Sequence, residues 1–151
     1  MATRVYLGAD HAGYALKERL QGFLARKGFE TIDLGTHSPE PVDYPDYAFR
    51  VAEKVAKGKK DFGLLVCSTG TGMCIAANKV KGIRAAGIFN EASALGAREH
   101  NNANIICLQG RSSGAAKAER LVQVFFSAKP SKEARHARRI EKISKYEKNR
   151  G

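Results

Sequence analysis

The feature that most constrains this chain is a buried apolar run that ends in a glycine-rich turn and leads into a helix. Residues 62–67 are almost continuously apolar, as expected for a strand covered on both faces. The turn that follows reads Ser-Thr-Gly-Thr-Gly over residues 68–72, and residues 73–79 are predicted as the helix. A buried strand that passes directly into a helix is typical of a parallel sheet layered with helices.

This turn places a thiol beside a backbone that can bind an anion. Cys67 ends the predicted strand, and the small residues after it let backbone N–H groups converge near a helix N-terminus. The pattern therefore offers Cys67 as a base or nucleophile beside an anion-binding loop. The alternative is a buried structural cysteine before an ordinary glycine turn, which is the commoner use of a free cysteine.

The strand-then-helix pattern recurs along the whole chain. Further strands are predicted at residues 4–8, 29–34, 83–89 and 104–108, and further helices at 14–27, 46–57, 91–100, 115–127 and from Ser131 to about residue 148. This alternation predicts a three-layer Rossmann-like α/β domain, with a five-stranded parallel sheet, helices on both faces and a C-terminal helical extension. We assign residues 1–128 to the α/β domain and 129–151 to the extension.

Polar side chains follow three of the predicted strands. Asp10 and His11 come after the first strand, the Cys67 turn after the third, and Arg111 after the fifth. Ligands of such sheets bind at the carboxyl ends of the strands, and the first and third strands are commonly neighbours. Connectivity alone therefore predicts a shared pocket at this edge.

The charge of the chain favours an anionic partner. The formal net charge is +11, and residues 129–151 contribute +6 of it. Arg135 and Arg139 lie four residues apart on the last predicted helix, and two guanidinium groups on one face suit a phosphate. On spacing alone, a solvated basic face is the commoner meaning of such a run.

Several common ligands are disfavoured by the motifs. A nicotinamide-binding loop needs a third glycine, and Ile75 stands in its place after Gly70 and Gly72, which weakens that interpretation without eliminating it. The chain lacks a Walker loop, and its four histidines show no metal-ligand spacing, so we expect neither metal nor cofactor. Tyr146 is the only aromatic residue of the basic tail, which disfavours nucleic acid.

The compartment is also suggested by composition. Three cysteines with no Cys-x-x-Cys pair argue against a disulfide framework and for a reducing cytosol. The sequence shows no apolar run of membrane-spanning length and no signal peptide. We therefore expect a cytoplasmic protein without a membrane contact.

Taken together, six motifs resemble one family, the type B ribose-5-phosphate isomerases, which include galactose-6-phosphate and allose-6-phosphate isomerases. They are Gly-Ala-Asp-His-Ala-Gly (8–13), Asp-Tyr-Pro-Asp-Tyr-Ala (43–48), Cys-Ser-Thr-Gly-Thr-Gly (67–72), Ala-Ala-Asn-Lys (76–79), His-Asn-Asn-Ala-Asn (100–104) and Arg-His-Ala-Arg-Arg (135–139). The match runs in order along nearly the whole chain. It implies a metal-independent aldose–ketose isomerase that interconverts ribose 5-phosphate and ribulose 5-phosphate, and that forms a dimer or a dimer of dimers.

The resemblance also implies roles for individual residues. Cys67 matches the base, because Met73 stands where some relatives carry a glutamate base, and His100 matches the residue that assists ring opening. The loop that holds the enediolate matches Ser68, Thr69, Gly70, Thr71 and Gly72, with Thr69 among the catalytic positions. Substrate contacts match Asp10, His11 and Asn101, and the phosphate-side cations match Arg111, Arg135 and Arg139.

His100 does not fit a site made by one chain. It ends a helix before the fifth strand, so it is expected at the amino edge of the sheet, one strand length of about 17–20 Å from Cys67. A helix-end histidine that only interacts with the helix dipole is the simpler alternative. We expect instead that His100 and Asn101 of a second subunit complete each pocket, in a two-fold dimer.

Overall fold

The sheet at the centre of the molecule has the predicted class and connectivity. The computed structural model describes residues 2–111 and 114–150. The five strands are all parallel, in the order β2-β1-β3-β5-β4. Their bounds are β1 (Arg4–Ala9), β2 (Glu30–Asp33), β3 (Phe62–Cys67), β4 (Ala85–Gly87) and β5 (Ile105–Gln109). β1 and β3 are neighbours, as expected, and the carboxyl ends of β1, β3 and β5 adjoin one another.

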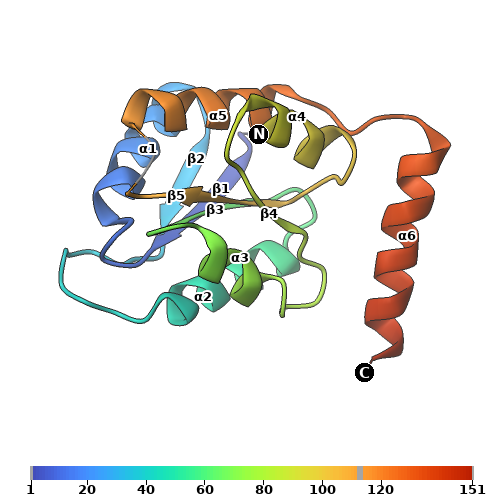
Figure 1. The fold of residues 1–151 in the computed structure, drawn as a ribbon, viewed down its shortest axis with the longest axis horizontal. Helices are drawn as coiled ribbons and strands as arrows, with labels where there is room; N and C mark the ends of the chain where they lie inside the picture. The colour runs from blue at the N-terminus through green and yellow to red at the C-terminus, as the bar shows by residue number, and fades with distance from the viewer. Residues whose placement is uncertain (1, 112–113, 151) are drawn as a thin grey trace.

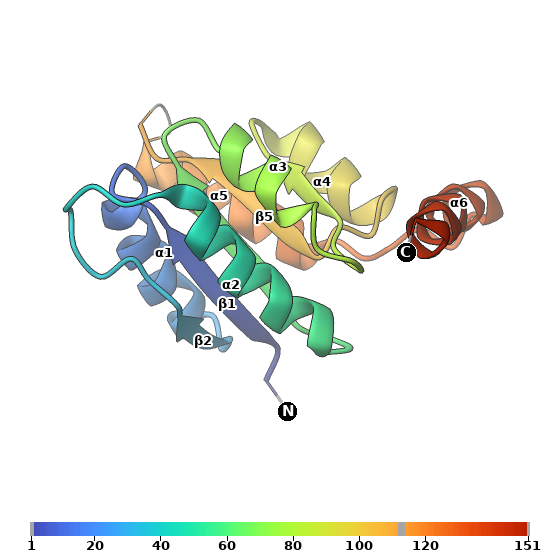
Figure 2. The same cartoon turned by 90° about the horizontal axis from the view of Figure 1, so that it is seen from below.

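Helices cover both faces of this sheet (Figures 1 and 2). One layer holds α1 (Tyr14–Arg26), α4 (Glu91–Glu99) and α5 (Ala115–Ser127), and the other holds α2 (Tyr44–Lys57) and α3 (Thr71–Ala77). The last helix, α6 (Ala134–Asn149), stands to one side of the three layers in both views. The predicted three-layer α/β fold with a C-terminal helical extension is therefore confirmed.

The alternation of side chains along β3 explains why the core has two halves. Leu64 and Val66 pack in the cluster under α1, α4 and α5, whereas Leu65 and Cys67 pack in the cluster under α2 and α3. Successive side chains of a strand point to opposite faces. Cys67 thus projects toward the α2–α3 layer.

Most element boundaries agree with the sequence prediction to within two residues, and three corrections are informative. α2 begins at Tyr44 rather than at 46, because Pro45 is tolerated in the first turn, where its missing N–H costs no hydrogen bond. β4 spans three residues instead of the seven predicted. Ser131 does not cap α6, which begins at Ala134; its hydroxyl accepts a hydrogen bond from the Glu133 N–H at 3.1 Å.

A buried ion pair anchors the start of the long loop before α2. The ammonium of Lys17 is fully buried and lies 2.6 Å from Asp33, at the end of β2. Burial opposes ionisation of Asp33, but hydrogen bonds from Lys17 and from the Gly35 N–H outweigh it and hold the pKa of Asp33 below its usual value. The pair fixes where this loop leaves the sheet.

The remaining structural findings concern the loop after β5 and the helices as a group. The predicted loop at 109–114 includes residues 112 and 113, which lie outside the described residues. Among the helices of the described ranges, none has the length and apolar character needed to cross a membrane.

Candidate functional site

Three loops meet at the carboxyl edge of the sheet, as the connectivity predicts. The Asp10 N–H donates to the Val66 carbonyl at 3.3 Å, which ties the loop after β1 to β3. The Gly110 N–H donates to the Cys67 carbonyl at 2.7 Å, and the Arg111 N–H donates to the Ser68 carbonyl at 3.4 Å. These backbone bonds join the three loops into one surface.

Two glycines allow this close approach. A Cβ atom on Gly13 would lie 2.3 Å from the Val66 carbonyl oxygen, and one on Gly110 would lie 2.5 Å from the Ala12 carbonyl oxygen. Backbone atoms at such positions cannot move aside as the end of a side chain can. Gly13 and Gly110 are therefore required by the packing of the loops.

Cys67 lies at the base of this surface. It is 5% exposed, and the Gly70 N–H donates to its sulfur at 3.2 Å. Gly70 has a φ of +79°, a left-handed conformation that turns the chain back over the sulfur before α3 begins at Thr71. The Thr69 hydroxyl oxygen accepts a hydrogen bond from the Thr71 N–H at 3.3 Å. These hydrogen bonds order the predicted turn around the thiol.

Asp10 and His11 lie on the same edge and are both held by backbone amides. The Asp10 carboxylate accepts from the Gly13 N–H at 3.0 Å and is buried. His11 Nδ1 accepts from the Val42 N–H at 3.2 Å, which leaves Nε2 as the ring's donor nitrogen. The edge therefore presents a thiol, a carboxylate and an imidazole from two neighbouring strands.

Tyr44 is a neighbour of the Cys67 turn that the sequence did not assign to the site. A Cβ atom on Gly72 would lie 2.5 Å from Cε1 of Tyr44, so the ring rests directly on this glycine. Tyr44 is 38% exposed and begins α2. The only sequence feature that pointed to this contact was Gly72 itself, because a residue without a Cβ atom leaves room for an aromatic ring.

A second thiol lies behind the turn. Hydrogen bonding with the Cys107 thiol, opposed by partial burial, lowers the pKa of Cys74 to about 7. The same hydrogen bond, together with burial, raises the pKa of Cys107. Because Cys74 ionises near neutral pH, thiol reagents alone cannot identify Cys67 as a functional group.

The other predicted site residues lie at the opposite edge of the sheet. His100 follows the last residue of α4, the helix that returns the chain to the start of β5. The Ser131 N–H donates to the Glu99 carbonyl at 2.8 Å, which brings the start of α6 to the same place. His100 and His136 stack there, with ring centroids 4.5 Å apart and planes 9° apart. The six residues of β3 separate this edge from Cys67 by about 20 Å.

The predicted phosphate cations are solvent-exposed in the single chain. Arg135 pairs with Glu133 at 2.7 Å, with both side chains 56% exposed, and Arg139 is exposed one turn further along α6. Arg111 is also exposed, but it lies on the Cys67 side. The structure therefore brings together Asp10, His11, Arg111 and the Cys67 turn, and it places His100, Asn101, Arg135 and Arg139 elsewhere.

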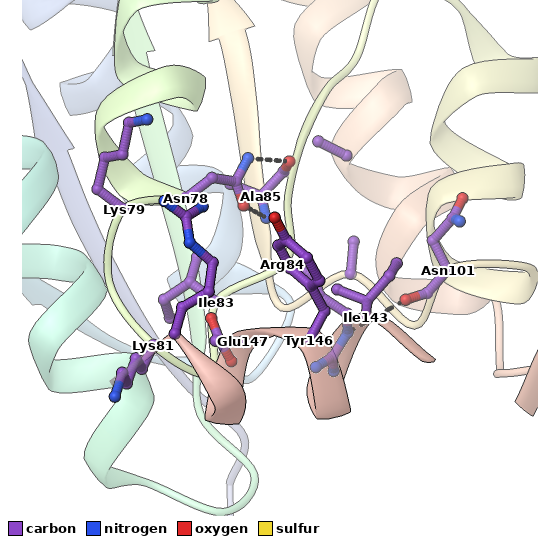
Figure 3. A pocket seen from close by; sticks show the side chains of 13 residues that line it. Asn78, Lys79, Lys81, Ile83, Arg84, Ala85, Asn101, Ile143, Tyr146 and Glu147 are labelled. Carbon is purple, nitrogen blue, oxygen red and sulfur yellow. Dashed lines mark hydrogen bonds between the residues drawn. The ribbon is translucent and has the colours of Figure 1, made fainter. Parts of the chain in front are cut away.

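A cleft separates α6 from the body of the molecule (Figure 3). Its volume is about 730 Å³, and its walls include Arg84 and Asn101 on the body and Ile143 and Tyr146 on α6. Ile143 is 55% exposed and Tyr146 is 66% exposed. Ile75 on α3, beside the Cys67 turn, is likewise 59% exposed. Within the described residues, no cluster of three or more His, Cys, Asp or Glu side chains could hold a metal ion.

Comparison with known proteins matches nearly the whole chain to one family. The pattern of the ribose/galactose isomerases matches residues 5–143. Ribose-5-phosphate isomerase B of Escherichia coli K12 is 40% identical over 147 residues, covering 97% of this chain and 98% of the relative. The enzyme of that name from Mycobacterium tuberculosis H37Rv is 41% identical over 146 residues, covering 96% of this chain and 90% of the relative.

Solved structures agree in fold over the same length. Ribose-5-phosphate isomerase B of Clostridium thermocellum superimposes with a TM-score of 0.95 at 45% identity, covering 99% of this chain and all of that one. The Mycoplasma genitalium enzyme, solved with ribulose 5-phosphate bound, superimposes with a TM-score of 0.94 at 43% identity, covering 98% of each chain.

Proposed function

This chain belongs to the ribose/galactose isomerase family, and from that premise we propose that it interconverts D-ribose 5-phosphate and D-ribulose 5-phosphate. The observation that carries the proposal is the buried Cys67 sulfur, which accepts the Gly70 N–H at the meeting point of three strand ends. A reacting carbon placed over this sulfur would be close to an acid–base group and to backbone donors together. Such an arrangement suits proton transfer between neighbouring carbons.

Cys67 acts as the base in this mechanism. After the sugar ring opens, the thiolate takes the proton from C2, and the electron pair of that bond forms a C1–C2 double bond while O1 becomes an enediolate oxygen. The O2 proton moves to O1, and the thiol returns its proton to C1, which yields the ketose. One residue can make both transfers because the two carbons are adjacent.

The turn after Cys67 stabilises the enediolate. The backbone of Thr69 to Gly72 is held by the left-handed Gly70 and by the start of α3, which places its amides beside the thiol. The Gly70 and Thr71 N–H groups donate to the Cys67 sulfur and the Thr69 hydroxyl in the free chain, and they exchange these partners for the enediolate oxygens. Loss of one such donor costs about 2.7–4 kcal/mol in enzymes where it has been measured. Asp10 and His11 contact the sugar from the neighbouring strand end.

The other half of the pocket is supplied by a second subunit. His100 assists ring opening, Asn101 contacts a hydroxyl, and Arg135 and Arg139 bind the phosphate together with Arg111. This proposal is supported by the placement of His100 and the two α6 arginines at the far edge of their own chain. Exposed Ile75, Ile143 and Tyr146 supply apolar surface for a two-fold contact, in a dimer or a dimer of dimers.

Residues 129–151 have two roles in this assembly. They form the extension that completes the phosphate site and contributes dimer contacts, which agrees with a helix that stands apart from its own domain (Figure 1).

The three free cysteines, one of them with a pKa of about 7, fit a reducing compartment, so we propose the cytoplasm.

The test of activity compares five- and six-carbon sugar phosphates. Ribose 5-phosphate, allose 6-phosphate and galactose 6-phosphate are each supplied to the purified protein, and ketose formation is followed directly. We expect the highest kcat/KM with ribose 5-phosphate. A higher value with either hexose phosphate assigns the chain to the six-carbon branch of the family, and no turnover of any of the three overturns the proposal.

The test of the shared pocket mixes two variants. Cys67→Ala and His100→Ala chains are each expected to have little activity, and subunit exchange should restore part of it because one pocket of each mixed dimer has both groups. Native mass spectrometry confirms exchange. Confirmed exchange without recovery contradicts a pocket made by two chains.

A further inference from the structure

The turn that carries His100 and Asn101 is held in an unusual conformation. Asn102 has a φ of +45°, in the left-handed region, and reverses the chain between α4 and β5. Its N–H donates to the Arg98 carbonyl at 3.2 Å, and the Ala103 N–H donates to the Ala97 carbonyl at 2.9 Å. The directions in which the exposed His100 and Asn101 side chains leave the molecule depend on this reversal.

Arg84 binds this turn through its guanidinium group. Nε donates to the Asn101 carbonyl at 3.2 Å and to the Asn102 carbonyl at 3.0 Å, and Nη2 donates to the Asn102 carbonyl at 2.8 Å. Asn101 and Asn102 follow His100, the C-cap of α4, so these two carbonyls belong to the turn and not to the helix. A planar, permanently charged fork can contact two successive carbonyls, which the single ammonium of a lysine does less well.

The backbone of Arg84 is fixed to the same stretch. Its N–H donates to Oδ1 of Asn104 at 2.8 Å, and its carbonyl accepts from the Asn104 N–H at 3.0 Å. Arg84 therefore cannot shift along the turn. Partial burial lowers the pKa of Arg84, an effect that Glu147 of α6 opposes. Within the described residues, Arg84 forms no ion pair within 4.0 Å, and its guanidinium donates instead to backbone carbonyl oxygens, which carry only a partial negative charge.

The cleft beside Arg84 does not explain this arrangement as an anion site. Lys79 and Lys81 also line the cleft, but Figure 3 shows their amino groups pointing away from it. Arg84 lines the same cleft, together with Asn101 on the body and with Ile143 and Tyr146 on α6. The guanidinium is therefore committed to the turn.

We propose that Arg84 is a positioning residue, which holds the Asn101–Asn102 backbone so that His100 and Asn101 enter the pocket of a second subunit in the correct orientation. This inference rests on the proposed function. A misplacement of about 1 Å at a catalytic group can cost about a hundredfold in rate. Arg84 thus serves the chain that supplies His100 and is not needed in the chain that supplies Cys67.

The mixed dimer of Cys67→Ala and His100→Ala chains allows a direct test, because its one competent pocket takes each half from a known chain. Arg84→Met is placed first on the Cys67→Ala chain, which supplies the intact His100. We expect kcat of the mixture to fall about tenfold or more. The same substitution on the His100→Ala chain, which supplies Cys67, should leave kcat within about twofold, since this chain's turn is not in the competent pocket.

Controls separate positioning from a general loss of structure. Arg120→Met removes an exposed ion pair with Glu91 and should leave the mixture unchanged in either chain. Arg84→Lys should recover part of the loss, and it replaces Arg84→Met if that chain does not fold by circular dichroism.

The outcomes are distinct. No recovery in the parent mixture overturns the shared pocket and this inference with it. If the parent mixture recovers activity, two results overturn the inference alone and leave the shared pocket intact. One is an equal loss of kcat whichever chain carries Arg84→Met, and the other is no loss of kcat with the substitution on either chain.

Discussion

The two edges of the sheet both carry polar side chains, but the surrounding structure holds these side chains in different ways. At the carboxyl edge, Cys67 is buried, and three loops are joined by backbone hydrogen bonds and by glycines in close contact. At the amino edge, His100, Asn101, Arg135 and Arg139 are exposed, and α6 stands apart from the body. The first half is ordered by its own chain, whereas the second is presented outward. This difference is what a pocket completed by another subunit requires.

The largest effect is expected from removing the thiol at the ordered edge. Cys67→Ser places a hydroxyl with a far higher pKa where the base stands, and turnover should fall by about a hundred- to ten-thousandfold. The melting temperature should hardly change, because the two side chains differ little in size. Steady-state kinetics with ribose 5-phosphate and thermal denaturation measure the two quantities. Near-normal turnover would remove Cys67 from the mechanism.

Cys74→Ser is the matched control for this substitution. Cys74 ionises more readily than an ordinary thiol, but it lies behind the turn and bonds to the Ala85 carbonyl. We expect little change in kcat, so a large loss in both variants would point to a structural role for the thiols.

The rigidity of the carboxyl edge can be broken at a single glycine. In Gly13→Ala the added methyl would meet the Val66 carbonyl oxygen, and the backbone must move to admit it. We expect the free energy of unfolding to fall by about 3 kcal/mol. Chemical denaturation measures this value, and Gly22→Ala is the control.

A Cβ atom on Gly22 meets only the end of the flexible Arg26 side chain, and Gly22 lies inside α1. Alanine there should be neutral or stabilising by about 0.5–1 kcal/mol. Equal stability of the Gly13 and Gly22 variants would show that the loops at this edge are not tightly joined.

The exposed edge should respond in binding and not in stability. Arg135→Ala and Arg139→Ala each remove a charged donor from the proposed phosphate site, a loss of about 1.5–3 kcal/mol that corresponds to a rise in KM of about ten- to a hundredfold. The unfolding transition should not move, because both side chains are exposed. Arg138→Ala, on the same helix, is the control. An equal KM for all three variants would mean that Arg135 and Arg139 belong to a solvated basic face and do not bind the phosphate.

The same contrast explains what could be predicted from the sequence. Strand and helix periodicity gave the order of elements, and connectivity alone placed Asp10, Cys67 and Arg111 on one edge. The contact between Tyr44 and Gly72 could not be predicted, because it joins residues far apart in the chain. The position of α6 beside the three layers could not be predicted either, because its basic sequence indicates a solvated face but not where the helix lies.

The short β4 shows a further limit. Residues 83–89 are apolar enough to predict a longer strand, but the Arg84 N–H donates to the Asn104 side chain at 2.8 Å, and β4 begins only at Ala85. Long-range hydrogen bonds, which local sequence does not encode, decide where an edge strand ends.

The smallest effect concerns the stacked histidines that join α6 to α4. Burial lowers the pKa of His136, and nearby His100, Arg135 and Arg139 lower it further, against a smaller opposing effect of Glu133. The unfolded chain therefore takes up this proton at a higher pH than the folded chain does. Stability should be complete above the ordinary histidine pKa of about 6.5 and should decline as the pH falls from there toward the lower pKa of the folded state.

His136→Gln isolates this contribution, because glutamine keeps a planar polar side chain but does not titrate. The melting temperature of the parent protein should fall between about pH 7.5 and pH 5.5, and the variant should fall less over the same range. Other titrating groups affect both proteins alike, so the difference between the two curves reports His136. Parallel curves would mean that protonation of His136 does not loosen the contact between α6 and α4.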